Sequence, residues 1–167
     1  MIILIGGGSR SGKSRHALEY SGRMPEPRVF IATAEMLDDE MRERASAHKS
    51  ERGDRFNTIE EPINLASAIS SVDRNATSVI VDCLTLWVSN LLLAGLDVRE
   101  ESGRMLDAAA EHPAAVLLVT NEVGCGIVPE NALARRFRDE AGWLNQRAAS
   151  AAQEVWWMVF GCPLRVK

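Results

Sequence analysis

A glycine-rich segment at residues 7–14 constrains the fold of this chain more than any other feature. It reads GGSRSGKS and fits the pattern G-x-x-x-x-G-K-[ST]. An apolar run precedes it at 2–5, and good helix formers follow from Lys13. A turn of this kind between a strand and a helix directs backbone N–H groups and the positive end of the helix dipole toward an anion. The pattern therefore predicts a phosphate-binding loop.

The polar residues of this loop suit a nucleoside triphosphate. Lys13 can neutralise charge on the β- and γ-phosphates, and the Ser14 hydroxyl can bind the Mg²⁺ that bridges them. The alternative is a glycine turn that only joins a strand to a helix, and motif and context together favour nucleotide binding. The candidate nucleotide contacts are Gly7, Gly8, Ser9, Arg10, Ser11, Gly12, Lys13 and Ser14.

Short apolar runs recur along the rest of the chain and indicate an α/β fold. Strands are expected at 2–5, 29–32, 79–81, 116–119 and 155–160, with helices at 13–22, 38–52, 62–71, 84–94, 99–111 and 131–152. Runs such as IILI and VIV are apolar throughout, which is typical of a mostly parallel sheet with helices on both faces. The chain has 167 residues with no repeat or linker, so we expect one domain over 1–167.

Composition narrows the classes of function. Nineteen Lys and Arg against 23 Asp and Glu give a net charge of −4, which offers no overall positive field to a nucleic acid. Three cysteines form neither a CxxC pair nor an even set, which argues against a disulfide framework or a structural zinc site. No signal peptide or sufficiently long apolar stretch is present. We expect a cytoplasmic protein with no transmembrane segment and no nucleic-acid partner.

Asp82 follows the apolar run at 79–81. A carboxylate at the C-terminal edge of a parallel sheet faces bound phosphates, so Asp82 and Ser14 are the expected ligands of a nucleotide's Mg²⁺. The alternative is a cap on the helix that is expected from Leu84, because Asp also favours that position.

A histidine lies among cations in the expected helix 38–52. Arg44, His48 and Arg52 are spaced by four residues and therefore share one side of a helix. Neighbouring cations disfavour imidazolium, which leaves a nitrogen lone pair able to attack phosphorus. The alternative is a solvated helix face paired with glutamates, and spacing alone favours that alternative.

Four segments together resemble one enzyme family. They read GGGSRSGKSRHA, FIATAEMLDDEMRERASAHKSER, IVDCLTLWVSNLL and TNEVGCGIVPENALARRFRDEAGWLNQRAA. They are similar to the bifunctional adenosylcobinamide kinase/adenosylcobinamide-phosphate guanylyltransferases of cobalamin biosynthesis, over nearly the whole chain. The helix that leads to His48, the NEVG-x-GIVPEN segment and the FRD-x-AG-x-x-NQ segment are more specific than the phosphate loop. The resemblance therefore raises the nucleophile hypothesis for His48 above its alternative.

The resemblance implies two reactions. A nucleoside triphosphate phosphorylates the aminopropanol hydroxyl of adenosylcobinamide, and GTP then donates GMP to that phosphate through a guanylylated histidine. It implies ATP, GTP and Mg²⁺ as cofactors, a three-layer RecA-like P-loop NTPase fold, and a homotrimer with nucleotide sites near subunit boundaries. His48 and Lys13 are the implied catalytic residues. Further implied nucleotide contacts are Thr33, Ala34, Glu35, Lys49, Ser50, Glu51, Arg52, Glu60 and Asp82.

Two other functions fit the same residues. A P-loop kinase for another small alcohol would use Lys13, Ser14 and Asp82 and leave His48 with a structural role. A nucleotide-controlled binding module would change shape with nucleotide but catalyse no cobinamide-dependent turnover.

Overall fold

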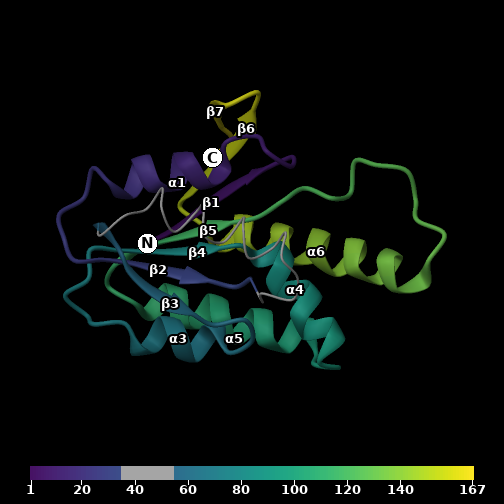
Figure 1. The fold of residues 1–167 in the computed structure, drawn as a ribbon, viewed down its shortest axis with the longest axis horizontal. Helices are drawn as coiled ribbons and strands as arrows, with labels where there is room; N and C mark the ends of the chain where they lie inside the picture. Colours follow the sequence, from purple (N-terminus) through teal and green to yellow (C-terminus); the bar gives the residue numbers. More distant parts are fainter. Residues whose placement is uncertain (35–54) are drawn as a thin grey trace.

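A seven-stranded sheet runs through the centre of the molecule, whose computed structural model describes residues 1–34 and 55–167 (Figure 1). Within these ranges the strand order is β3-β2-β4-β5-β1-β6-β7. Neighbouring strands are parallel except for β6 and β7, which form an antiparallel hairpin. The strands are β1 (Ile2–Gly7), β2 (Arg28–Ala32), β3 (Asn57–Glu60), β4 (Ser78–Asp82), β5 (Ala115–Val119), β6 (Glu154–Val159) and β7 (Cys162–Arg165).

Helices cover both faces of this sheet (Figure 1). Ile3 and Ile5 of β1 belong to the apolar cluster on the side of α1 (Lys13–Ser21). Ile2 and Leu4 belong to the cluster on the opposite face. That face carries α3 (Leu65–Ser71), α4 (Leu84–Leu93), α5 (Val98–Glu111) and α6 (Ala132–Ala151). Since alternate side chains enter different clusters and both are buried, the uninterrupted apolar strands and the expected α/β class are confirmed.

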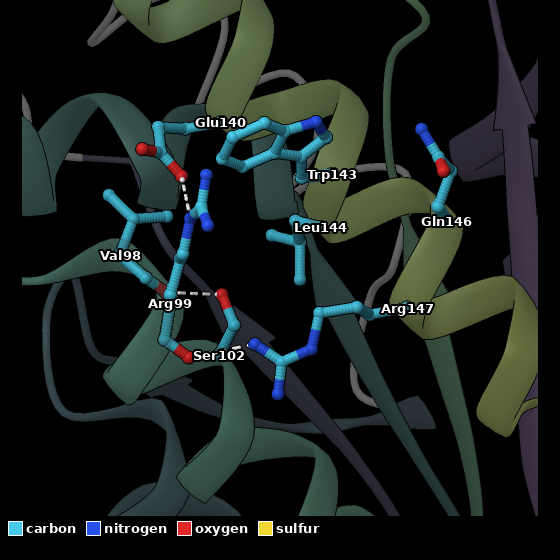
Figure 2. Close-up of a pocket in the computed structure, with 8 residues that line it drawn as sticks. All are labelled: Val98, Arg99, Ser102, Glu140, Trp143, Leu144, Gln146 and Arg147. Atoms are coloured by element: carbon cyan, nitrogen blue, oxygen red, sulfur yellow. Dashed lines mark hydrogen bonds and ion pairs between the residues drawn. The ribbon is translucent and has the colours of Figure 1, made fainter.

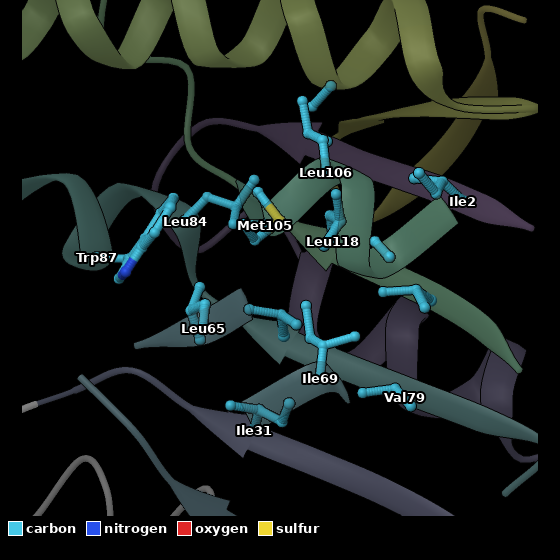
Figure 3. Close-up of a cluster of buried hydrophobic side chains, with 14 of the residues drawn as sticks. Ile2, Ile31, Leu65, Ile69, Val79, Leu84, Trp87, Met105, Leu106 and Leu118 are labelled. Atoms are coloured by element: carbon cyan, nitrogen blue, oxygen red, sulfur yellow. The ribbon is translucent and has the colours of Figure 1, made fainter. Parts of the chain in front are cut away.

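The larger cluster fixes α4 against the sheet (Figure 3). Trp87 of α4 is fully buried beside Leu84 and Met105, and its indole N–H donates to the carbonyl of Ile63 at 2.7 Å. Burying a side chain of this size stabilises the fold by roughly 3 kcal/mol, and the indole N–H keeps a partner as burial requires. The start of α4, directly after Asp82, is thereby held in place.

The sequence predicted most of these elements to within three residues. The expected strand 155–160 ends earlier, because Phe160 and Gly161 form the turn from β6 to β7. Strands β3 and β7 were not predicted, and both carry mostly exposed side chains without a long apolar run. The helix expected at 38–52 lies outside the described residues. Among the helices that the structure describes, none is long and apolar enough to span a bilayer.

Candidate functional site

The loop between β1 and α1 has the backbone conformation that its glycines allow. Gly12 is the N-cap of α1, with φ 94° in the left-handed region. At Gly7, where φ is 150°, an added Cβ would lie 2.8 Å from the carbonyl oxygen of Met158 in β6. A side chain at either position would be strained or would collide, so both positions favour glycine. Residues 8–12 thus form a tight turn between the end of β1 and the start of α1, close to β6.

Lys13 is buried within this turn. Its Nζ donates to the carbonyl of Gly8 at 2.5 Å and lies 3.5 Å from the hydroxyl of Ser11. Burial is the main cause that lowers the pKa of Lys13, and the carboxylate of Asp82 acts in the opposite direction. An anion in the loop would offset the cost of burying this ammonium group. The arrangement is therefore suited to phosphate.

Asp82 ends β4 at the same edge of the sheet and is half-buried. Its influence on the pKa of Lys13 indicates that the two side chains share one electrostatic environment. Strand β5 separates β4 from β1, and Asp82 lies opposite Val119 of β5 in the register. A carboxylate and the Ser14 hydroxyl are hard oxygen donors, so the residues present fit a Mg²⁺ ion held largely by phosphates.

Thr33 acts on this site through the protein backbone. Its side chain is fully buried, and its hydroxyl donates to the carbonyl of Cys83 and accepts from the N–H of Cys83, both at 2.8 Å. The side-chain amide of Asn90 donates to the carbonyl of Thr33 at 2.9 Å. The sequence suggested Thr33 as a nucleotide contact, whereas the structure commits its hydroxyl to the segment that follows Asp82.

Cys83 itself is not suited to be a nucleophile. Burial is the main cause that raises the pKa of its thiol to about 12, so the thiol stays protonated at neutral pH. Within the described ranges, no group of three or more His, Cys, Asp or Glu side chains could hold a metal ion.

A second polar network joins two of the sequence motifs. The hydroxyl of Thr120, just after β5, donates to the amide oxygen of Asn145 in α6 at 2.7 Å. Asn145 in turn donates to the carbonyl of Asn121 at 3.2 Å, and the N–H of Asn121 donates to Thr85 at 2.7 Å. The N–H of Glu122 donates to the carbonyl of Gly7 at 3.1 Å. The NEVG segment is therefore fastened both to the FRD-x-AG-x-x-NQ helix and to the phosphate loop.

Some of the other expected nucleotide contacts lie within the described residues and some lie outside them. Glu60 is exposed at the carboxyl end of β3, in register with Ala32 of β2, and Ala34 is half-buried just beyond β2. The structure thus places the phosphate loop, Asp82, Ala34 and Glu60 along one edge of the sheet. The remaining expected residues lie outside the described ranges: Glu35, His48, Lys49, Ser50, Glu51 and Arg52, together with Arg44 of the cationic stripe.

A hollow of about 260 Å³ between α5 and α6 is not lined by any residue of the phosphate loop (Figure 2). The guanidinium of Arg99 lies 3.3 Å from the ring centroid of Trp143 and 3.6 Å from a carboxylate oxygen of Glu140. Arg147 donates to the carbonyl of Arg99 at 2.8 Å. These charged groups hold α5 against α6, and we assign the hollow a packing role.

Comparison with known proteins identifies the family. The model of a family described as cobinamide kinase / cobinamide phosphate guanyltransferase matches residues 3–166. The chain belongs to this family. It is 42% identical over 182 residues to the bifunctional adenosylcobalamin biosynthesis protein CobU of Salmonella typhimurium, with 100% of each chain covered. It is 41% identical over 169 residues to the protein CobP of Pseudomonas aeruginosa, with 100% of this chain and 98% of that one covered.

Membership confirms the resemblance seen in the sequence and the expected kinase and guanylyltransferase function. The chain is accordingly an enzyme that uses a nucleoside triphosphate. The alternatives of a kinase for an unrelated alcohol and of a non-catalytic binding module do not agree with matches that span the whole chain.

Solved structures of distant proteins share the fold. The flagellar accessory protein FlaH of Methanocaldococcus jannaschii superposes with a TM-score of 0.54 at 11% identity, over 99% of this chain and 77% of that one. A KaiC-like protein of Pyrococcus horikoshii gives a TM-score of 0.52 at 18% identity, over 93% and 69%. The RadB recombinase gives a TM-score of 0.51 at 15% identity, over 93% and 73%. These likenesses concern the fold alone and confirm the expected P-loop architecture.

Proposed function

We propose that this protein phosphorylates the aminopropanol hydroxyl of adenosylcobinamide and then transfers GMP from GTP to the new phosphate, with His48 as the covalent carrier. The observation that carries the proposal is the full-length family match together with a buried Lys13 inside a glycine-rich phosphate loop. We further propose that residues 1–167 act as one catalytic domain in the cytoplasm, within a homotrimer.

In the kinase step, the substrate hydroxyl oxygen forms a bond to the γ-phosphorus of ATP or GTP. The bond from the γ-phosphorus to its bridging oxygen breaks, the hydroxyl proton is released, and a nucleoside diphosphate leaves. Lys13 and the N–H groups of residues 8–14 bind the phosphates and orient them. Mg²⁺, which Ser14 and Asp82 would hold with the nucleotide, supplies charge neutralisation when bound. No protein nucleophile is needed for this step.

In the transfer step, a ring nitrogen of His48 forms a bond to the α-phosphorus of GTP, and pyrophosphate leaves. A phosphate oxygen of adenosylcobinamide phosphate then attacks the same phosphorus and breaks the bond to His48. The product is adenosylcobinamide-GDP, and the side chain of His48 returns to its unmodified form. Further nucleotide contacts are proposed at Ala34, Glu35, Lys49, Ser50, Glu51, Arg52 and Glu60.

Intact-mass measurement after incubation with GTP and Mg²⁺, without corrinoid, tests the role of His48. The wild type should gain one GMP and release pyrophosphate. The His48→Ala variant should gain none, whereas His112→Asn should label like the wild type, since His112 hydrogen-bonds the carbonyl of Val72 at a remote helix end. The adduct should be lost in acid and survive base, because a phosphoramidate behaves in this way.

Phosphorylation of adenosylcobinamide should survive in His48→Ala, which also shows that the variant folds. If the wild type phosphorylates adenosylcobinamide but never gains GMP, the protein is a kinase without the proposed covalent transfer step. Undiminished labelling of His48→Ala would assign the carrier role to another residue.

A further inference from the structure

The β6–β7 hairpin is attached directly to the phosphate loop. The N–H of Gly161, at the hairpin tip, donates to the carbonyl of Ser11 at 3.1 Å. A Cβ added at Gly12 would lie 3.4 Å from the Cα of Gly161, so a side chain at Gly12 would press against the hairpin. Figure 1 shows the hairpin beside the loop that joins β1 to α1. The tip is therefore held at a fixed place next to any bound phosphate.

Phe160 occupies this tip in an unexpected way. Its side chain is 99% exposed, so it contributes to neither apolar cluster of the described residues. Val159 pairs with Cys162, which leaves a two-residue turn in which Phe160 has φ 51° and Gly161 has φ 80°. Turns with two positive φ values favour Asn-Gly, and a bulky side chain in this conformation is an outlier. Neither packing nor turn chemistry accounts for phenylalanine at this position.

The strand order gives the tip its place relative to a nucleotide. β6 runs parallel to β1, so its carboxyl end, like the phosphate loop, lies where ligands bind to parallel sheets. Asp82 lies on one side of β1, beyond β5, and the hairpin lies on the other. A nucleotide with its phosphates on the loop and its metal toward Asp82 has the hairpin side free for its base.

Arg15 adds a cation at the same place. One of its guanidinium nitrogens lies 3.4 Å from the position of a Cβ built on Gly161 and 3.7 Å from one built on Gly12. The tip therefore has an exposed aromatic ring in its turn and a guanidinium group against its backbone, and both kinds of group can stack on nucleobases without base-specific hydrogen bonds.

We propose that Phe160 is a stacking platform for the base of the nucleoside triphosphate that binds at residues 7–14. The inference rests on the proposed nucleotide site in that loop. Every base offers a π-face, so stacking on Phe160 favours nucleotides over bare phosphates without distinguishing adenine from guanine. The phosphate loop would then accept ATP and GTP alike.

Equilibrium titration with three probes in the presence of Mg²⁺ tests this role. The probes are the α,β-methylene analogues of GTP and of ATP, which resist cleavage at the α-phosphorus, and inorganic tripolyphosphate, which has no base. Phe160→Asn should weaken the binding of both nucleotide analogues by about 5- to 150-fold, the range for loss of one base stack. Its affinity for tripolyphosphate should equal that of the wild type.

Stability and a matched variant keep this test independent of folding. Phe160→Asn should unfold at the same or a higher temperature than the wild type, because Asn-Gly suits the turn. Phe160→Trp should retain nucleotide affinity. Leu164→Ala, which removes another exposed apolar side chain from the same hairpin, should change none of the affinities.

The contrary outcomes are distinct. Equal losses for all three probes, or no loss for any, would overturn the stacking role of Phe160 and leave the phosphate loop in place. If Phe160→Asn lowers the molecular mass of the assembly in solution and leaves nucleotide affinity unchanged, Phe160 forms a contact between subunits instead. A wild type that binds none of the three probes would overturn the nucleotide site itself.

Discussion

Thr33 and Cys83 form two hydrogen bonds with each other, each 2.8 Å long, across the carboxyl ends of β2 and β4. Residue 82 is therefore fixed from both sides, by its ladder with β2 and by this pair. The hydroxyl of Thr33 is the only group of that side chain able to donate and accept in this way.

Replacing Thr33 by valine should lower both the stability and the activity of the enzyme. Valine keeps the shape but leaves the buried N–H and C=O of Cys83 without this partner, which costs about 2 kcal/mol or more in free energy of unfolding. Denaturant titration and steady-state assays measure the two effects. Thr33→Ser keeps the hydroxyl and is the control. Wild-type turnover in a folded Thr33→Val would show that the pair does not position Asp82.

Replacing Lys13 by methionine should suppress both phosphorylation and GMP transfer by roughly 100-fold or more, because each needs a triphosphate whose charge this ammonium group offsets. The free protein should remain folded, since burying a charged amine in the unliganded loop is unfavourable. Arg74→Met, which removes an exposed cation, is the control. If Lys13→Met lowers only one of the two activities, the phosphate loop serves only that activity.

Replacing Asp82 by asparagine should raise the Mg²⁺ concentration needed for half-maximal activity and lower the maximal rate. The amide retains an oxygen ligand but has lost the charge that favours a divalent cation. Binding of tripolyphosphate without metal should be unchanged or tighter, since one negative charge is gone. Asp107→Asn, on the exposed side of α5, is the control. An unaltered Mg²⁺ dependence in Asp82→Asn would remove Asp82 from the metal site, and helix capping would not explain the residue, because the N-cap of α4 is Cys83.

His16 gives the fold an acid sensitivity. Its buried Nε2 has no hydrogen-bond partner among the described residues, and its ring lies 5.4 Å from that of Trp156. Burial is the main cause that lowers the pKa of His16 below 6.5; Arg23 acts in the same direction and Glu19 opposes it. The unfolded chain therefore binds a proton that the folded chain excludes, so the free energy of unfolding declines as the pH falls below about 6.5.

The His16→Leu variant should lose part of this decline. Melting temperatures at pH 7.5 and pH 5.0 measure it, and their difference should be smaller in the variant than in the wild type. At pH 5.0 the variant should be the more stable of the two proteins. If the stability of the two proteins changes with pH in the same way, His16 binds a proton equally well in the folded and the unfolded chain.

The elements that sequence predicted are those whose signal is local. The central residues of β1, β4 and β5 are buried on both faces of the sheet, so apolar side chains are favoured at consecutive positions. β3 reads NTIE and β7 reads CPLR. These segments are strands because they hydrogen-bond to β2 and β6, and their own composition does not indicate a strand. Edge strands with exposed faces carry little hydrophobic pattern, which explains why both were missed.

The site divides in the same way. The phosphate loop is contiguous, so its spacing alone revealed it. The bonds from Thr33 to Cys83, and from Thr120 to Asn145, join residues 50 and 25 positions apart, and no periodicity marks them. The sequence did contain one usable signal, because both asparagines of the Asn121–Asn145 contact belong to the motifs quoted for the family resemblance.

The position of β1 in the sheet determines when this enzyme can first bind nucleotide during its synthesis. Ile2 pairs with Val116 and Ile3 pairs with Glu154, so the first strand made waits for partners from the last third of the chain. A ribosome releases the apolar β1 and the glycine loop long before either has a neighbour, and such distant pairings form slowly. Nucleotide can therefore stabilise only a nearly finished chain, in which β1 has both of its neighbouring strands.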